Sequence, residues 1–193
     1  MPQRDILDLL KDDHRVILSF LRALDAYADS LDCDSADPDG ARVALEFVRE
    51  FIEKGHHVRE EEVLFRYLAE KGRGKNSDGR HLIHCHDEAR DQLEGMRMAT
   101  PPTTPDARTA FVWNARAYTA LMREHMVLEE SWLYPRVGEL LSADDRRILA
   151  ERLSRYGFPR EASMEAAHRR IDALIQAAGR GFAEGAGQHP SPY

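Results

Sequence analysis

The chain has 193 residues, of which 27 are basic and 34 acidic, for a formal charge of -7. An apolar fraction of 42% and a charged fraction of 32% are typical of a helix-rich globular domain with a substantial core. The acidic balance and the lack of a basic patch exclude nucleic acid as an expected partner. The two cysteines, Cys33 and Cys85, have no paired spacing, which favours a reducing cytosol. Since the sequence also has no signal-peptide core and no run of about 18 apolar residues, we expect a cytoplasmic protein that does not span a membrane.

Four long stretches have helical periodicity and are separated by clusters of helix-breaking residues. We expect these helices at about residues 3–31, 38–71, 79–99 and 105–141. Asp37-Pro38 and Thr104-Pro105 are typical of helix starts. Pro135 is expected to bend the fourth helix or to end its regular hydrogen bonding.

Two shorter helices are expected after residue 141. Ser142 to Asp145 resembles a capping box with Asp in place of Glu, and it opens a helix to about residue 156. Another amphipathic segment covers residues 163–179, and the remaining residues have the composition of a frayed tail. No segment has a strand pattern.

The pattern therefore predicts an all-α fold. We expect an up-down-up-down four-helix bundle over residues 1–141 that binds metal, because such bundles commonly place metal sites between facing helices. Residues 142–180 are expected to form two additional C-terminal helices packed on the bundle, and residues 181–193 a flexible tail. The additional helices are expected to cover one side, restrict solvent access or make a homodimer contact.

Polar residues fill the central gaps in the apolar stripe of each long helix. In chain order they are His14, then His56 with Glu60, then His86, then His125 with Glu129. Residues at i and i+4 share one helix face, so each His-x-x-x-Glu pair offers a nitrogen and a carboxylate to the same site.

A metal centre explains why two glutamates lie in an apolar core, where an ionised carboxylate is costly unless it is paired or bound to a cation. Four imidazoles and two carboxylates suit a dinuclear centre better than a single ion. This donor set favours Fe, Mn or Zn, and the lack of thiolates argues against a Cys-rich zinc site.

Other interpretations of these residues remain open. Helix geometry also permits a His57–Glu61 pair, although the apolar stripe and the match to His125–Glu129 favour His56–Glu60. Glu61 and Glu130 lie about 100° round their helices from the first glutamates, so we expect them to be surface or flanking groups. A ferritin-like site would use Glu-x-x-His pairs such as Glu165–His168, and a metal-free bundle would use the histidines only for packing.

Four motifs together resemble the hemerythrin-like family, the HHE cation-binding domains. They are DHRVI at 13–17, HHVREEEVLF at 56–65, HDEAR at 86–90 and HMVLEESWLYP at 125–135, and the resemblance covers about residues 5–140. It implies a four-helix bundle around a non-haem di-iron centre, with two iron ions joined by an oxo or hydroxo group; Mn and Zn are the alternative metals. By this resemblance Glu60 and Glu129 are bridging ligands, and His14, His56, His86 and His125 are terminal ligands.

The sequence departs from the oxygen-carrying members of that family. Those proteins have a fifth histidine one turn before the position of His86, where this chain has Leu82, and an aspartate ligand in place of Glu129. Four histidines and two glutamates are closer to the family's iron-centre repair proteins, although no segment here resembles their N-terminal cysteine-bearing domain. The resemblance implies binding of, or reaction with, a small diatomic molecule or peroxide (oxygen, nitric oxide or peroxide). The alternative is iron storage or delivery without turnover, and whether the protein is an enzyme stays open.

Overall fold

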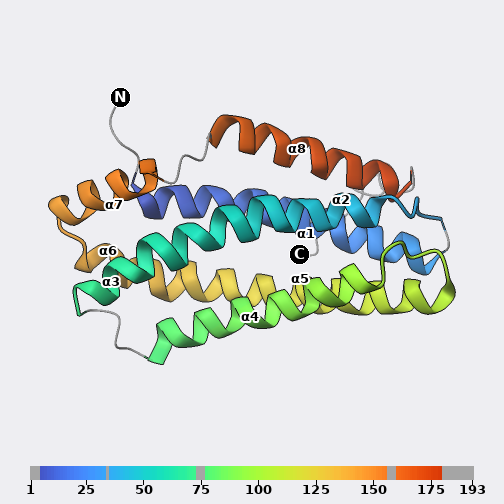
Figure 1. Cartoon of the computed structure of the whole chain (residues 1–193), viewed down its shortest axis with the longest axis horizontal. Coiled ribbons are helices and arrows are strands. Elements are labelled where there is room, and N and C mark those ends of the chain that lie inside the picture. The colour runs from blue at the N-terminus through green and yellow to red at the C-terminus, as the bar shows by residue number, and fades with distance from the viewer. Residues whose placement is uncertain (1–4, 34, 73–76, 156–159, 180–193) are drawn as a thin grey trace, which may run out of the picture.

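The computed structural model describes residues 5–33, 35–72, 77–155 and 160–179, apart from the side chains of 77–81, 83 and 160–162. Every element within these residues is a helix, and four long helical rods lie side by side with alternating direction (Figure 1). This arrangement confirms the predicted all-α bundle with two additional helices.

The rods follow the expected order along the chain. The first is α1 (Ile6–Asp32), and the third is α4 (Ser77–Met98). The second comprises α2 (Gly40–Phe47), η1 (Val48–His57), η2 (Arg59–Phe65) and α3 (Arg66–Glu70). The fourth comprises α5 (Pro105–Leu128), η3 (Glu129–Leu133) and α6 (Tyr134–Leu140). The additional helices are α7 (Ala143–Arg155) and α8 (Arg160–Ala177).

Side-chain capping is present at the starts of α1, α5 and α7, but not at the predicted start of α2. The side chain of Asp5 accepts the Leu7 N–H at the start of α1, and Thr104 accepts the Ala107 N–H at the start of α5. The predicted Asp37-Pro38 start is wrong by two residues. Asp37 instead accepts the Asp39 N–H in a preceding turn, and α2 begins at Gly40.

The predicted capping box of α7 is present. The Ser142 backbone N–H donates to Asp145 Oδ2 at 2.9 Å, and the Asp145 backbone N–H donates to Ser142 Oγ at 3.2 Å. This reciprocal pair satisfies two N–H groups at the helix start, so Asp serves here in the place usually taken by Glu.

Pro135 does not end the fourth rod, which continues to Leu140. The segment just before it, η3, is a π-helix, and Pro135 lies in the first turn of the α-helix that follows. A proline is tolerated in a first turn because its missing N–H is not needed there.

The core consists of two apolar clusters. The larger one contains most of α1 with α2, α5 and α8, including Phe20, Phe47 and Phe111. The smaller one joins the start of α1 to α3, α6 and α7, including Leu10, Tyr67 and Leu149. Buried polar residues, described below, lie along the same four rods.

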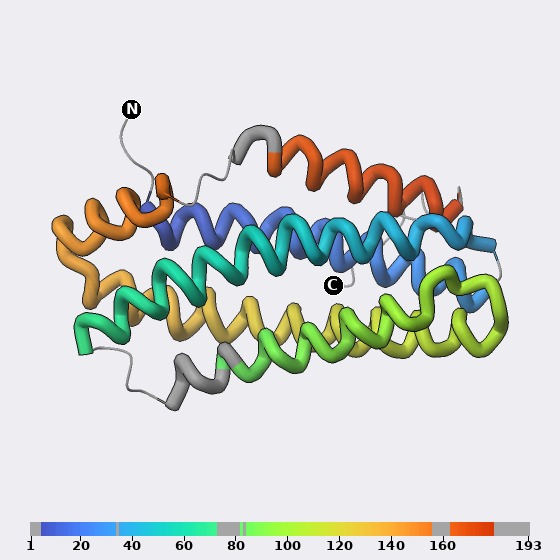
Figure 2. Tube along the Cα trace, viewed as in Figure 1, coloured from blue at the N-terminus to red at the C-terminus, as the bar shows by residue number. Residues whose placement is uncertain are grey.

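The two C-terminal helices pack against opposite ends of the bundle (Figure 2). Ile171 and Leu174 of α8 are buried in the larger cluster, and Leu149 of α7 is buried in the smaller one. The predicted boundary between the bundle and the C-terminal extension, at residue 141, stays a prediction. Helices on both sides of this boundary contribute to the same apolar clusters. The predicted tail, residues 181–193, lies outside the described residues. None of the described helices is both long enough and apolar enough to cross a membrane.

Candidate metal centre

Four buried imidazoles meet in the middle of the bundle, one from each long rod. His14 Nε2 lies 3.2 Å from His56 Nε2, and His86 Nε2 lies 3.0 Å from His125 Nε2. All four side chains are at most 1% exposed. The structure therefore brings together the four histidines that the sequence placed in the apolar stripes, and it arranges them as two pairs.

Glu60 and Glu129 lie between the two imidazole pairs, and both are fully buried. Glu129 Oε2 is 3.2 Å from His14 Nε2, and its Oε1 is 3.2 Å from His125 Nε2. Glu60 Oε2 is 3.5 Å from His56 Nε2 and 3.4 Å from His86 Nε2. Each carboxylate thus reaches both pairs.

Two donor groups result, and they share both carboxylates. We call His14, His56, Glu60 and Glu129 the first group, and Glu60, His86, His125 and Glu129 the second group. Within each, one ligand atom per residue lies within 4.8 Å of all the others. Two groups that share two carboxylates match a dinuclear arrangement.

The donor atoms fit metal ions by two independent observations. Glu60 Oε2 and Glu129 Oε1 are buried without a hydrogen-bond partner in the described part of the chain, which is costly for an ionised carboxylate unless a cation balances it. Bonds of about 2.1 Å to one metal separate neighbouring octahedral ligands by about 3.0 Å. The nitrogen–nitrogen and nitrogen–oxygen separations of 3.0 to 3.5 Å are close to this value.

Local helix geometry helps to bring these groups inward. His56 and Glu60 lie in the π-helical segments η1 and η2, and Glu129 begins η3. A π-helix hydrogen-bonds one residue further along than an α-helix, and such segments are frequent at functional sites. The α-helical phase used for the sequence prediction therefore holds only approximately here.

Without metal, the raised pKa values of His14 and His86 offset part of the carboxylate charge. Burial raises the pKa of Glu129, but His125 and His14 outweigh it and hold that pKa well below its usual value. Burial lowers the pKa of His86, but Glu60 and Glu61 outweigh it and raise that pKa to about 9. The pKa of His14 is also raised, because Glu129 outweighs burial. Cations bound between these groups would displace the imidazole protons.

Each shared carboxylate is followed in the chain by a second glutamate, and the two form the doublets Glu60-Glu61 and Glu129-Glu130. The second glutamate of each doublet accepts a hydrogen bond from an imidazole of a neighbouring rod. His14 Nδ1 donates to Glu130 Oε1 at 2.8 Å, and His86 Nδ1 donates to Glu61 Oε1 at 2.7 Å. These contacts fix each ring with its Nε2 toward the centre, which is how metal-binding histidines are usually oriented. Glu130 and Glu61 are partly exposed, with 46% and 27% of their side chains accessible, so they are flanking groups as expected.

Arg90 supports the second of these contacts. Its guanidinium donates to Glu61 at 2.7 Å and to Glu53 at 2.8 Å. His86 and Arg90 together lower the pKa of Glu61 to about 2, although burial opposes them. Glu61 is therefore an ionised acceptor across the neutral pH range.

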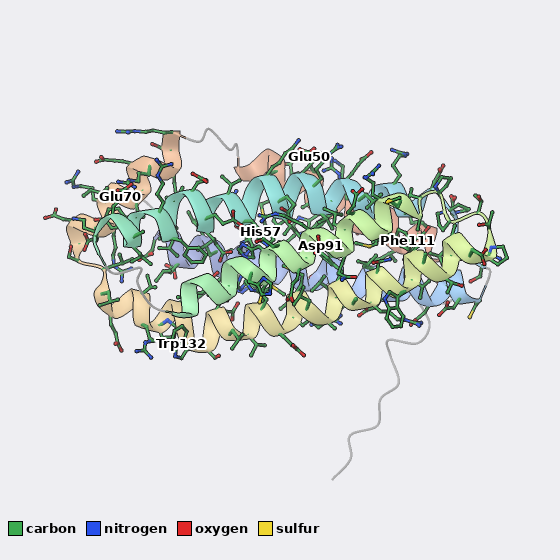
Figure 3. The ribbon with its side chains drawn as sticks, turned by 60° about the horizontal axis from the view of Figure 1, so that its bottom comes forward. Glu50, His57, Glu70, Asp91, Phe111 and Trp132 are labelled. Atoms are coloured by element: carbon green, nitrogen blue, oxygen red, sulfur yellow. The ribbon has the colours of Figure 1, made fainter. Side chains whose placement is uncertain are left out.

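His57 is buried as well, although the α-helical pattern favoured only one of His56 and His57. His57 lies among the helices of the bundle (Figure 3). Its ring stacks on His86, with centroids 3.8 Å apart, and its Nδ1 donates to Glu53 at 3.0 Å. His56 faces α1 while His57 faces α4, so two adjacent residues contact two different rods. Burial and the neighbouring His86 hold the pKa of His57 well below its usual value.

His57 belongs to neither of the two groups that share carboxylates. With Glu61 and His86 it forms a third set of close donor atoms. The Arg90 guanidinium already neutralises Glu61 in this set, which disfavours a cation there. The structure thus places His56, rather than His57, beside the shared carboxylates.

Tyr134 is a site residue that the sequence interpretation missed. Its hydroxyl donates to Glu60 Oε1 at 2.6 Å and lies 3.2 Å from His14 Nε2. Burial and the two carboxylates raise its pKa well above the usual value, so the hydroxyl is protonated in the metal-free protein. The sequence contains a signal for it: segments 56–65 and 125–134 follow the same pattern of histidine, two glutamates, leucine and a final aromatic residue, and this aromatic residue is Phe65 in the first segment and Tyr134 in the second.

The residues that a ferritin-like site or a fifth-histidine position would use lie outside the two donor groups. The side chains of Glu165 and His168 are exposed on α8, so they do not complete a ferritin-like site. Leu82, at the position of the missing fifth histidine, is buried in the smaller apolar cluster. Cys85 is buried but belongs to none of the donor groups found among the described residues.

The fold and the buried donor groups define a helical-bundle protein with a metal-binding core. The chain belongs to the hemerythrin family: the sequence model of the hemerythrin HHE cation-binding domain matches residues 5–137. This match confirms the resemblance drawn from the four motifs.

A relative with a stated function is the iron-sulfur cluster repair protein YtfE of Musicola paradisiaca (strain Ech703). The two sequences are 31% identical over 140 residues, which are 68% of this chain and 62% of the relative. The similarity therefore spans less than two thirds of that protein. No solved structure matches the chain significantly.

Proposed function

We propose that this protein holds a non-haem di-iron centre and binds, or reacts with, a small molecule such as oxygen, nitric oxide or peroxide. The proposed ligands are His14, His56, Glu60, His86, His125 and Glu129. The observation that carries the proposal is that two imidazole pairs share two buried carboxylates, each within 3.5 Å of both pairs.

Iron is the metal that this donor set and the family relationship favour. Imidazole nitrogen and carboxylate oxygen together suit Fe, Mn and Zn. The relative's printed role, iron-sulfur cluster repair, supports iron among these three. A bound iron pair would supply Lewis-acidic, redox-active ions that attract small oxygen- and nitrogen-containing ligands.

The protein contributes a closed environment. The six proposed ligands are at most 1% exposed, so the centre is shielded from bulk water. Glu61 and Glu130 fix two of the rings from outside and keep their Nε2 atoms directed inward.

Iron storage or delivery without turnover is the second candidate. The relative's printed role, iron-sulfur cluster repair, is compatible with handling of iron rather than of a small molecule. The same six ligands serve either function, so the reactivity of the loaded protein distinguishes them.

The test is metal analysis of protein purified from iron-replete cells. We expect about two irons per chain and a near-ultraviolet oxo-to-iron absorption. Spectra before and after addition of oxygen, nitric oxide and peroxide then identify the reactive ligand. Release of iron to a chelator under reductant, without a spectral response to any of the three, favours storage or delivery.

The variant His56→Ala should reduce the iron content, whereas His84→Ala should not. His84 is the matched control because it is an exposed histidine two residues from His86, with 66% of its side chain accessible. Less than about one metal per chain in the wild type, with no change in His56→Ala, would contradict the proposal.

A further inference from the structure

The Tyr134 hydroxyl lies beside His14 of the first donor group and beside the two shared carboxylates, and no hydrogen bond joins it to His86 or His125 in the described residues. We propose that Tyr134 is an additional, phenolate ligand of the metal ion held by His14 and His56, which makes the two metal positions chemically unequal. This inference rests on the proposed function, because it requires a metal at that position.

The geometry is that of a neighbouring ligand. Tyr134 Oη lies 2.6 Å from Glu60 Oε1, 3.2 Å from His14 Nε2 and 3.4 Å from Glu129 Oε2. Adjacent octahedral ligands of one metal are about 3.0 Å apart. The hydroxyl oxygen therefore already lies where a ligand of the first position would lie, without any movement of its helix.

The contacts of this hydroxyl differ from those of the other hydrogen-bonded buried tyrosines. Tyr27 Oη donates to the backbone carbonyl of Asp37, and Tyr67 Oη donates to Asp145, both outside the donor groups. Tyr134 Oη instead contacts the two shared carboxylates, and the one imidazole it contacts is that of His14, which belongs to the first group alone. Its ring is 1% exposed and stacks on His14, with centroids 5.5 Å apart, so the hydroxyl is held in place.

The internal repeat shows that this oxygen has no counterpart in the first copy. Segments 56–65 and 125–134 match in their histidine, glutamates and leucine, but Phe65 stands where the second copy has Tyr134. The first position would then have five protein donors, and the second position would have the four of its own group. The second position, between His86 and His125, is therefore the one left open for an external small molecule.

The chemistry needs no additional reactant. When Fe(III) binds, an iron–oxygen bond forms, the phenol O–H bond breaks, and the proton leaves to solvent with those displaced from the imidazoles. Phenolate oxygen is a hard, anionic donor that suits ferric iron. No oxidation state changes in this step.

Resonance Raman spectroscopy of the iron-loaded protein tests this inference. A phenolate bound to Fe(III) produces a visible charge-transfer absorption, and excitation in that band enhances the vibrations of the tyrosine ring. We expect these vibrations in wild-type protein, a shift when the protein is grown with ring-deuterated tyrosine, and complete loss in Tyr134→Phe.

Matched controls remove the other buried tyrosine hydroxyls of the described residues. Tyr118→Phe deletes a hydroxyl that has no hydrogen-bond partner there, Tyr67→Phe deletes one bonded to Asp145, and Tyr27→Phe deletes one bonded to the Asp37 carbonyl; all three should keep the signal. If Tyr134→Phe does not hold iron, these three variants and the deuterated wild type still assign the phenolate by elimination among the buried tyrosines that the structure describes.

Iron content separates the two proposals. Wild-type protein with about two irons and no phenolate vibrations would overturn the Tyr134 inference and leave the proposed function intact. Retention of the signal in Tyr134→Phe would overturn it as well. Wild-type protein that binds no iron would overturn the proposed function itself.

Discussion

The two donor groups have the same ligand types but different surroundings. In the first group, His14 is hydrogen-bonded to Glu130, which is nearly half exposed, and the buried Tyr134 hydroxyl lies beside the His14 Nε2 atom. In the second group, His86 is held by the less exposed Glu61, which Arg90 ties to Glu53, and His57 stacks on the ring. A repeated motif can therefore supply equal donors while the neighbouring rods make the two positions unequal.

The two groups are also held by each other's helices. Glu61 follows Glu60 on the rod that carries His56, yet it orients His86 of the second group. Glu130 follows Glu129 on the rod that carries His125, yet it orients His14 of the first group. Each doublet therefore provides one shared carboxylate and one carboxylate that positions the opposite group.

The largest expected effect comes from a shared carboxylate. Glu60→Gln or Glu129→Gln removes an anionic donor from both groups at once, so we expect loss of iron from both positions. Iron analysis after loading and desalting measures this. Glu62→Gln is the matched control, because Glu62 is on the same helix but half exposed. A variant that kept one full iron would show that its carboxylate does not serve both groups.

Histidine substitutions should separate the groups. His14→Ala removes a donor from the first position only, and His125→Ala from the second only, so we expect about one iron per chain in each. The phenolate signal of Tyr134 should disappear in His14→Ala and persist in His125→Ala. If both variants lost both irons, the two positions would be interdependent, which would contradict two separately held metal positions.

Loss of an outer carboxylate should have a smaller effect, confined to one group. Partners of this kind typically change metal affinity by about 10- to 100-fold. We expect Glu61→Ala to weaken the second position more than Glu130→Ala weakens the first, because Glu61 is less exposed and is fixed by Arg90. Competition with a chelator measures both affinities. If the two variants lost metal affinity equally, or if Glu130→Ala lost more than Glu61→Ala, the expected difference between the two outer carboxylates would be contradicted.

The smallest effect on either group should come from Asp145, which joins α7 to the bundle. Tyr67 and the groups of Ser142 lower its pKa below the usual value. A lowered pKa stabilises the folded state above about pH 4 and loses this contribution as the pH falls further. Asp145→Asn should therefore unfold at a lower temperature than wild type at neutral pH, and this difference should shrink below about pH 4.

Iron content provides the control for this last variant. Asp145→Asn should bind as much iron as wild type at neutral pH, because Asp145 contacts no member of either group in the described residues. Loss of iron from only one group would show that α7 supports that position through the smaller apolar cluster.

Much of this molecule was predictable from periodicity. The four rods, the two additional helices and the Ser142–Asp145 capping box follow from local patterns, since apolar spacing and capping are properties of neighbouring residues. His14 and His86 were found because each interrupts an apolar stripe. The exact start of α2 was not, because Asp37 bonds within a turn instead of capping the helix.

The donor types and their helical spacing follow from the amino-acid sequence, because both are encoded within single helices. How the donors are shared depends on the packing of the four rods. A rod packed between two others can bury adjacent residues toward different neighbours, as His56 toward α1 and His57 toward α4. The same packing directs Glu61 and Glu130 to imidazoles on other rods and brings the Tyr134 hydroxyl to the first group. These contacts join residues far apart in the chain, so no local pattern could specify them.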